Sequence, residues 1–171
     1  MRHRPTVHLR PATLADIPML QHWDQQPHVQ AATGADGDEG WEWETEVPRQ
    51  VAWRELLVAE VGGTPIGMVQ IIDPAEEETH YWGAVAPHQR ALDIWIGEAN
   101  YLGRGYGTQM MQQALARCWA HPQVTAVLID PLVTNTDAIR FYERLGFRKV
   151  EQRQFDEDLC WVMRLPRPTG A

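Results

Sequence analysis

The chain has 171 residues, 44% of them hydrophobic, with 8 tryptophans and a formal net charge of −8. A chain of this length and apolar content forms a single domain over 1–171 that buries roughly 70% of its unfolded surface, which excludes intrinsic disorder. The acidic balance argues against a nucleic-acid partner, because a phosphate backbone is bound by a basic surface, and it is compatible with a cationic substrate.

No segment predicts export or membrane insertion. The first residues lack the apolar stretch of a signal peptide, and no run reaches the roughly 18 apolar residues of a membrane span. Cys118 and Cys160 lie in apolar segments and are expected to be buried, reduced thiols. We therefore expect a cytoplasmic protein without a membrane partner, either a monomer or a homodimer.

The first half of the chain predicts a strand, a helix and a hairpin. Residues 7–10 alternate as a strand does, and an N-cap pattern at 13–16 starts a helix that runs to about 22. Gly62-Gly63 separates two apolar strands at 56–61 and 65–72, which is a strong hairpin pattern.

The second half predicts the remaining elements of an α+β domain around a mixed, mostly antiparallel sheet flanked by helices. These elements are a strand at 91–97, a helix at 105–119, a strand at 124–129, a helix at 137–145 ended by Gly146, and a hairpin of strands at 150–155 and 160–165. Two segments, 25–53 and 73–90, show no clear period, and long irregular segments in a compact domain are usually functional loops.

The strongest motif is the glycine-rich turn Leu102–Thr108, between the strand at 91–97 and the helix that follows. Three glycines in five positions let the backbone approach a ligand closely, and the first N–H groups of the helix favour an anion. The turn lacks the Lys-Ser or Lys-Thr of a nucleotide triphosphate loop, and Thr108 breaks the dinucleotide spacing. Taken alone, the turn fits an ordinary loop as well as a phosphate site.

About 30 residues later comes a second motif, 135–147, which contains Asn135 and Tyr142 on a short amphipathic helix. In this order and at this distance the two motifs resemble the acetyl-CoA site of the GNAT superfamily of N-acetyltransferases, over roughly residues 7–165. Asp93 in its strand, the segment 121–125 and Asp130-Pro131 make the chain more similar to aminoglycoside 6′-N-acetyltransferases. Leu102 departs from the Gln or Arg that often opens the superfamily's turn.

The resemblance implies a GNAT fold and a set of acetyl-CoA contacts. The backbone of the 103–108 turn would hold the pyrophosphate, with Arg104 adding charge, and the backbone of Ile94 and Ile96 would pair with the pantetheine arm as an added strand. Asn135 would hydrogen-bond pantetheine, and Tyr142 would donate to the departing thiolate. The implied co-substrate-binding residues are Ile94, Trp95, Ile96, Gly103, Arg104, Gly105, Tyr106, Gly107, Thr108, Asn135, Ala138 and Tyr142.

The reaction also needs a group that binds and deprotonates the acceptor amine, because an amine with a pKa of about 10.4 is almost wholly protonated at pH 7. Asp93 is the first candidate for this base and Asp130, at the end of the next strand, is the second. An aspartate within an apolar strand is expected to need a partner, whereas Asp130 could simply be a turn residue before Pro131. Tyr142 could equally be a core residue. The expected substrate contacts are Trp23, Asp24, Tyr81, Trp82, Asp93 and Asp130.

Three acidic segments, 36–46, 76–78 and 156–158, suit a polycationic aminosugar, although such runs are often only solvated loops. The histidines and cysteines show no metal-ligand spacing, so no metal is expected. The resemblance therefore implies transfer of acetyl to the 6′-amine of an aminoglycoside by direct attack. Alternatives are a GNAT that acts on a protein N-terminus, a polyamine or a siderophore precursor, and a non-catalytic CoA-binding domain.

Overall fold

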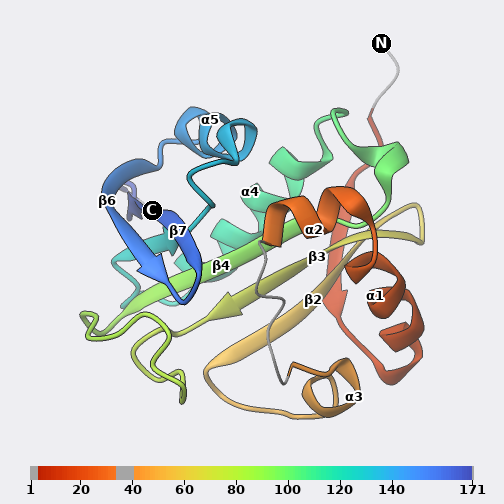
Figure 1. Cartoon of the computed structure of the whole chain (residues 1–171), viewed down its shortest axis with the longest axis horizontal. Coiled ribbons are helices and arrows are strands. Elements are labelled where there is room, and N and C mark those ends of the chain that lie inside the picture. Colours follow the sequence, from red (N-terminus) through yellow and green to blue (C-terminus); the bar gives the residue numbers. More distant parts are fainter. Residues whose placement is uncertain (1–3, 34–40, 171) are drawn as a thin grey trace.

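A computed structural model describes residues 4–33 and 41–170. Seven strands form one sheet in the order β1-β2-β3-β4-β5-β7-β6, and all neighbours are antiparallel except β4 and β5 (Figure 1). The strands are β1 (Val7–Pro11), β2 (Arg54–Val61), β3 (Thr64–Ile72), β4 (Gln89–Ile96), β5 (Ala126–Ile129), β6 (Arg148–Phe155) and β7 (Asp158–Pro166).

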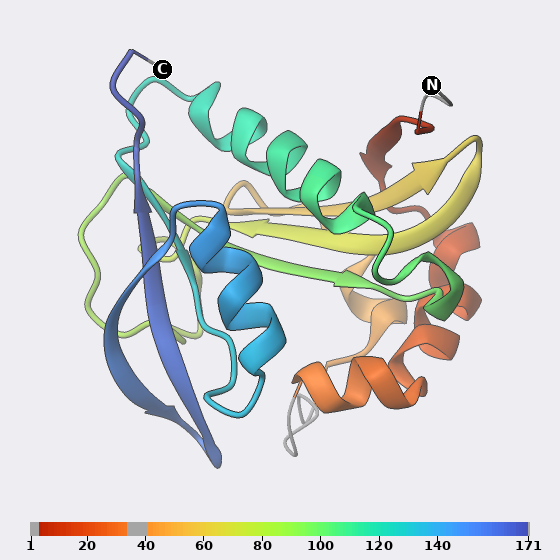
Figure 2. The same ribbon diagram turned by 90° about the horizontal axis from the view of Figure 1, so that it is seen from above.

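Helices cover both faces of the sheet. Figure 2 shows α4 on one face and α1 and α2 on the other. The helices are α1 (Ile17–Asp24), α2 (Pro27–Thr33), α3 (Trp43–Glu46), α4 (Tyr106–Trp119) and α5 (Thr136–Arg144), with 3₁₀ turns η1 (Leu14–Asp16) and η2 (Ala99–Tyr101).

Two hydrophobic clusters follow the alternation of the strands. On the α4 face, Met110, Met111 and Ala114 pack with Val69 and Ile71 of β3. On the opposite face, a second cluster joins Leu20, Trp23, Trp43, Val58 and Met68. The mixed sheet between helices is the predicted α+β architecture.

The predicted strands, the hairpin and the helices at 105–119 and 137–145 are confirmed within a few residues at their ends. The segment 25–53 was wrongly expected to be irregular throughout, because it contains α2 and α3. Both helices are short and bury a single side chain each, Val29 and Trp43, so neither produces a periodic apolar pattern. Residues 73–88 contain turns and no helix or strand, as predicted.

Both cysteines are buried and free, as the sequence indicates. Burial raises the pKa of each thiol, Cys118 and Cys160, to about 12, so neither thiol ionises near neutral pH. Cys118 packs on the inner face of α4, and Cys160 packs between Leu128 and Val162 in a third cluster. The two thiols are therefore core residues.

The parallel ladder between β4 and β5 is short. It comprises Gln89, Arg90 and Ala91 opposite Ala126, Val127 and Leu128, and the strands then diverge (Figure 2). Beyond this point, residues 92–96 of β4 pair only with β3 among the described residues. We call residues 92–96 the open edge of β4.

Candidate active site

The open edge of β4 presents the backbone groups of two predicted residues. The N–H of Gly97 donates to the Ile66 carbonyl of β3 at 2.8 Å. Because successive peptide groups of a strand point to opposite edges, the N–H and C=O of Ile96 and Ile94 face away from β3. Consistently, the side-chain nitrogen Nε2 of His28, from α2, lies 2.9 Å from the Ile96 carbonyl oxygen.

Trp95 differs from its two neighbours. Its carbonyl lies against Gly67 of β3, so its own N–H and C=O face β3, and any contact of Trp95 with the co-substrate would have to come from its side chain. Its side chain lies on the same face of β4 as Asp93 and packs near Trp43, with 6.5 Å between the ring centroids. The buried indole Nε1–H has no hydrogen-bond acceptor among the described residues.

The glycine-rich turn has the backbone conformation that its sequence predicts. Gly103 and Gly105 have φ of +67° and +84°, and Gly105 is the N-cap of α4. The first hydrogen bond of the helix runs from the N–H of Gln109 to the carbonyl of Gly105, at 3.4 Å. The N–H groups of residues 106–108 therefore precede the helical ladder and can face an anion.

The side chains of the turn take different roles. Tyr106 is buried in the core, so only its N–H is available to a ligand. Arg104 lies over the rings of Tyr101 and Tyr106 and donates to the Asn100 carbonyl at 3.0 Å, which turns its guanidinium toward η2. Gly107 faces Phe141 of α5, and a Cβ there would lie 3.6 Å from that ring.

Asn135 and Ala138 form the start of α5. The Asn135 side-chain oxygen accepts the Ala138 N–H at 3.3 Å as an N-cap. This bond fixes the side chain at the end of the loop after β5 and leaves its NH₂ group as a donor. The contact of Asn135 with pantetheine stays a prediction. The side-chain NH₂ group that would make this contact is held in place by the N-cap hydrogen bond.

An acidic pair, Asp93 and Asp130, lies where β4 and β5 diverge. Asp93 and Asp130 each lie two residues beyond the last β4–β5 pair, Ala91 and Leu128, and are close enough for the charge of one to act on the other. Burial and then the charge of Asp93 raise the pKa of Asp130. Asp93 is exposed on its strand, and its charge acts on Asp130.

Tyr81 holds Asp130. Its hydroxyl donates to Asp130 Oδ2 at 2.6 Å, and its ring stacks on Phe155 with 4.6 Å between centroids. Burial and the Asp130 charge raise the pKa of Tyr81, so the hydroxyl keeps its proton and remains a donor. Glu77 fixes this turn, because its buried carboxylate accepts the N–H groups of Thr79 and Tyr81 at 2.8 and 3.0 Å. Asp130 is thus more than a turn residue before Pro131.

The hydroxyl of Tyr142 also interacts with the charges of Asp93 and Asp130. Its ring packs at the rim of the α4-side cluster and is half-buried. Burial first, and then the charges of Asp93 and Asp130, raise the pKa of its hydroxyl. The hydroxyl is therefore a stable proton donor beside the acidic pair. Asp93, Asp130, Tyr81 and Tyr142 therefore act on one another electrostatically, and their roles in the reaction stay predictions.

Three other expected substrate residues, Trp23, Trp82 and Asp24, make structural contacts with neighbouring side chains. Trp23 is fully buried, fills the space beside Gly97 and donates to Glu98 Oε1 at 2.8 Å. Trp82 is 4% exposed and packs on Phe155. Neither indole can contact a substrate in this conformation, because apolar burial has taken both rings into the core. Asp24 is exposed, and its Oδ2 accepts the Nε1–H of Trp43 at 2.6 Å.

The acidic segments are partly engaged in structure. Residues 36 and 38–39 lie outside the described part of the chain. Glu46 pairs with Arg54 at 2.7 Å, and Glu78 pairs with Arg49. Glu77 is the buried turn-former described above, so the 76–78 run is not a uniform solvated cluster.

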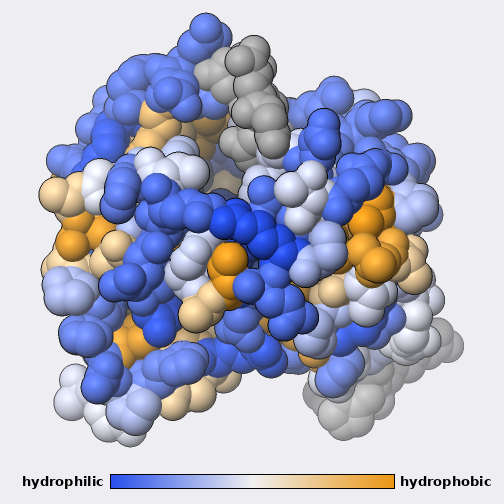
Figure 3. Space-filling view, turned by 90° about the horizontal axis from the view of Figure 1, so that it is seen from below, coloured by the Kyte–Doolittle hydropathy of each residue, from blue (hydrophilic) through white to orange (hydrophobic). Residues whose placement is uncertain are grey.

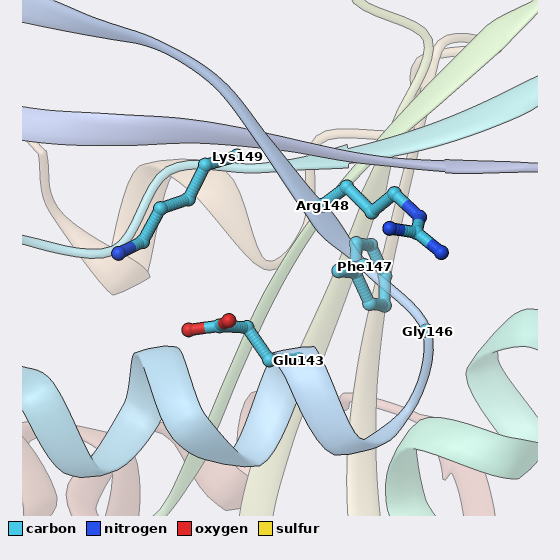
Figure 4. A pocket seen from close by; sticks show the side chains of 5 residues that line it. All are labelled: Glu143, Gly146, Phe147, Arg148 and Lys149. Carbon is cyan, nitrogen blue, oxygen red and sulfur yellow. The ribbon is translucent and has the colours of Figure 1, made fainter.

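A pocket of about 430 Å³ opens between the end of α5 and the start of β6 (Figure 4). Its lining residues are Glu143, Gly146, Phe147, Arg148 and Lys149. None of the predicted site residues lines it, so the candidate site is defined by the open edge and the acidic pair. In the described ranges, no group of histidine, cysteine and carboxylate side chains could hold a metal ion, and no helix is long and apolar enough to cross a membrane.

Comparison with known proteins identifies the class. A family model described as an acetyltransferase (GNAT) domain matches residues 12–155. The chain therefore belongs to the GNAT acetyltransferase family. It is an N-acetyltransferase with acetyl-CoA as its co-substrate, as the resemblance implied.

Two relatives and one solved structure show which members of the family the chain is similar to. The chain is 30% identical to aminoglycoside N(6′)-acetyltransferase type 1 of Klebsiella pneumoniae, over 84% of this chain and 75% of the relative. It is also 30% identical to lysine N-acyltransferase MbtK of Mycolicibacterium paratuberculosis, over 96% of this chain and 76% of the relative. The crystal structure of aminoglycoside acetyltransferase AAC(6′)-Ib with coenzyme A superposes with a TM-score of 0.80 at 26% identity, covering 95% of each chain.

Proposed function

We propose that this enzyme acetylates an amino group of a polycationic aminoglycoside, the 6′-amine, by direct attack on acetyl-CoA. The observation that carries the proposal is the acidic pair with its tyrosine partners at the open edge of β4. A structure of AAC(6′)-Ib with coenzyme A and kanamycin has the same fold at a TM-score of 0.80. The net charge of −8 favours approach of a cation.

The acidic pair suits an ammonium group. Two neighbouring carboxylates repel each other, which raises the pKa of Asp130, and a cation placed between them removes that repulsion. The pair therefore gains most from a charged amine and much less from a neutral ligand. Figure 3 shows one face of the molecule, which is largely hydrophilic with separate hydrophobic patches.

Asp93 is the proposed base. It takes one proton of the ammonium group directly or through a water molecule, and the free amine then attacks the thioester carbonyl. The C–N bond forms, the C–S bond breaks, the new amide nitrogen loses its second proton, and the departing thiolate takes up a proton. Asp93 is exposed, so the acceptor can reach it. Tyr142 keeps its proton at neutral pH and can therefore hydrogen-bond the departing sulfur.

Backbone groups hold the co-substrate in the same proposal. The N–H groups of 106–108 face the pyrophosphate, and the open-edge groups of Ile94 and Ile96 pair with the pantetheine arm. His28 contacts the Ile96 carbonyl and would yield this acceptor to pantetheine.

The test is a thiol-release assay with acetyl-CoA against kanamycin, tobramycin, spermidine, lysine and a peptide with an N-terminal Ser. Turnover with the aminoglycosides alone supports the proposal. Turnover with lysine alone would favour the activity named for the mycobacterial relative, to which the chain is equally similar. Acetyl-CoA binding without turnover on any of the five would contradict the proposed acceptor.

A matched pair of variants tests the base. Asp93→Asn should lower kcat by about 10²-fold or more while the Kd for CoA is unchanged. Glu55→Gln, in β2, removes a carboxylate charge on the α4 face of the sheet, where Glu55 pairs with Arg117, and should leave kcat as it is. Wild-type kcat in Asp93→Asn would remove Asp93 from the mechanism.

A further inference from the structure

A cation from the start of the chain lies on the glycine-rich turn. A Cβ built on Gly105 would overlap an Nη atom of Arg4 and lie 2.8 Å from its Cζ. Gly105 is the N-cap of α4, so the Arg4 guanidinium lies directly beside the first turn of that helix. Nothing in the sequence motifs indicates this contact, because Arg4 is about 100 residues away along the chain.

Side chains of α4 hold the segment that carries Arg4. The Gln109 amide both accepts the Val7 N–H at 2.9 Å and donates to the Pro5 carbonyl at 3.2 Å. One turn later, Gln113 donates to the Val7 carbonyl. These bonds clamp residues 5–7 along α4 and leave Arg4 at the N-terminal end of the helix.

The position is electrostatically unfavourable for a cation by itself. The N-terminus of a helix carries partial positive charge, so a guanidinium there is repelled unless an anion lies between them. Among the described residues, no carboxylate forms an ion pair with Arg4. Arg104, the cation that the motif predicts, is instead turned toward the Asn100 carbonyl.

We propose that Arg4 is a phosphate ligand of CoA and that Gln109 positions it. The guanidinium of Arg4 and the N–H groups of 106–108 would then both donate to the diphosphate. The anion turns the repulsion between Arg4 and the helix end into two attractions. The acetyl-CoA site thus includes the segment before β1, together with the strand edge and the turn.

The test measures binding of CoA by isothermal titration calorimetry without an acceptor, so its result does not depend on the identity of the acetylated amine. Arg4→Gln should raise the Kd for CoA about tenfold and make the Kd less dependent on salt. S-acetylpantetheine, which has no phosphate, should bind both proteins equally. Gln109→Ala should weaken CoA binding in the same direction by a smaller factor.

Arg117→Gln is the matched control, because Arg117 lies in the last turn of α4 and pairs with Glu55 at 2.6 Å. It should leave the Kd for CoA within twofold of wild type. An unchanged Kd and salt dependence in Arg4→Gln would overturn the proposal, as would tighter CoA binding, which would mean that Arg4 blocks the phosphate position. Equal weakening for CoA and S-acetylpantetheine would assign Arg4 a structural role and also overturn it.

Discussion

Removing one hydroxyl should move the pH profile of the enzyme. In Tyr81→Phe the ring can still stack on Phe155, while the 2.6 Å hydrogen bond to Asp130 is lost. That bond opposes the rise in the pKa of Asp130, since it stabilises the ionised carboxylate. Its loss therefore raises the pKa of Asp130 further.

The size of the shift follows from the strength of the bond. A hydrogen bond to a charged group contributes about 1.5–3 kcal/mol, and the lower end applies here because Asp130 is only half-buried. At 1.36 kcal/mol per pKa unit this amounts to about one unit. In the wild type the pKa of Asp130 is raised to about 8. If binding of a cationic acceptor needs ionised Asp130, kcat/KM rises with pH through that value, and the variant should reach the same level about one pH unit higher.

The assay is thiol release at subsaturating kanamycin between pH 6 and pH 9.5, with acetyl-CoA saturating. The acceptor amines ionise in the same range, but their contribution is identical for both proteins and cancels in the ratio of the two profiles. In an Asp130→Asn background, Tyr81→Phe should no longer shift the profile. A Tyr81→Phe profile that superposes on the wild type would refute the reasoning.

Three further predictions concern Tyr142, Asp130 and Trp95. Tyr142→Phe should lower kcat by about 10²-fold with the Kd for CoA unchanged, and a wild-type kcat would return Tyr142 to a packing role. The folded-state pKa of Asp130 is raised, so its contribution to stability is full below pH 4 and is lost as pH rises through about 8. Asp130→Asn should accordingly raise Tm at pH 8 by about 2 °C or more relative to its effect at pH 4, and an equal effect at both pH values would contradict the shift. Trp95→Phe removes the buried indole N–H that has no acceptor among the described residues, so Tm should hold or rise. If that N–H donates a hydrogen bond to a hydroxyl of the aminoglycoside, the KM for the aminoglycoside should rise about fivefold in Trp95→Phe. An unchanged KM would exclude this contact.

Local patterns predicted most of the fold. The Gly62-Gly63 hairpin, the helix behind Gly105 and the helix that ends before Gly146 are set by turn chemistry and periodicity that a short window of sequence contains. α2 and α3 escaped prediction because each depends on a single buried side chain, Val29 or Trp43, whose burial is decided by distant strands.

Much of the candidate site was also predictable, for a different reason. Asp93 and Asp130 end up together because β4 and β5 pair in parallel and then separate, and a motif resemblance carries that topology. The resemblance could not show which aromatic rings are buried, so Trp23 and Trp82 were misplaced. The alternation of β4 is a signal that was available, since it sets Trp95 on the face of Asp93 and turns its peptide toward β3.

Contacts between remote segments were not predictable. Tyr81 reaches Asp130 from a loop without periodicity, and its position depends on the buried carboxylate of Glu77. Arg4 lies beside Gly105 because the side-chain amide of Gln109 hydrogen-bonds the neighbouring backbone of Pro5 and Val7. Such contacts arise from loop paths and side-chain hydrogen bonds, for which a single sequence has no periodic signature.

The short β4–β5 ladder has a consequence for how the domain responds to its co-substrate. Only three residue pairs join the four-stranded part of the sheet to the β5-β7-β6 part. This β4–β5 junction is therefore the least extensively paired one in the sheet. A pantetheine arm along the open edge would hydrogen-bond the unpaired backbone groups of β4 and so add contacts between the two parts of the sheet. At a hundredfold excess over Kd, a ligand stabilises the folded state by about 2.7 kcal/mol. Acetyl-CoA should then slow hydrogen exchange most at β4 and β5 and least at β1 and β2. The co-substrate would in this way stabilise the sheet where its own strands are paired least.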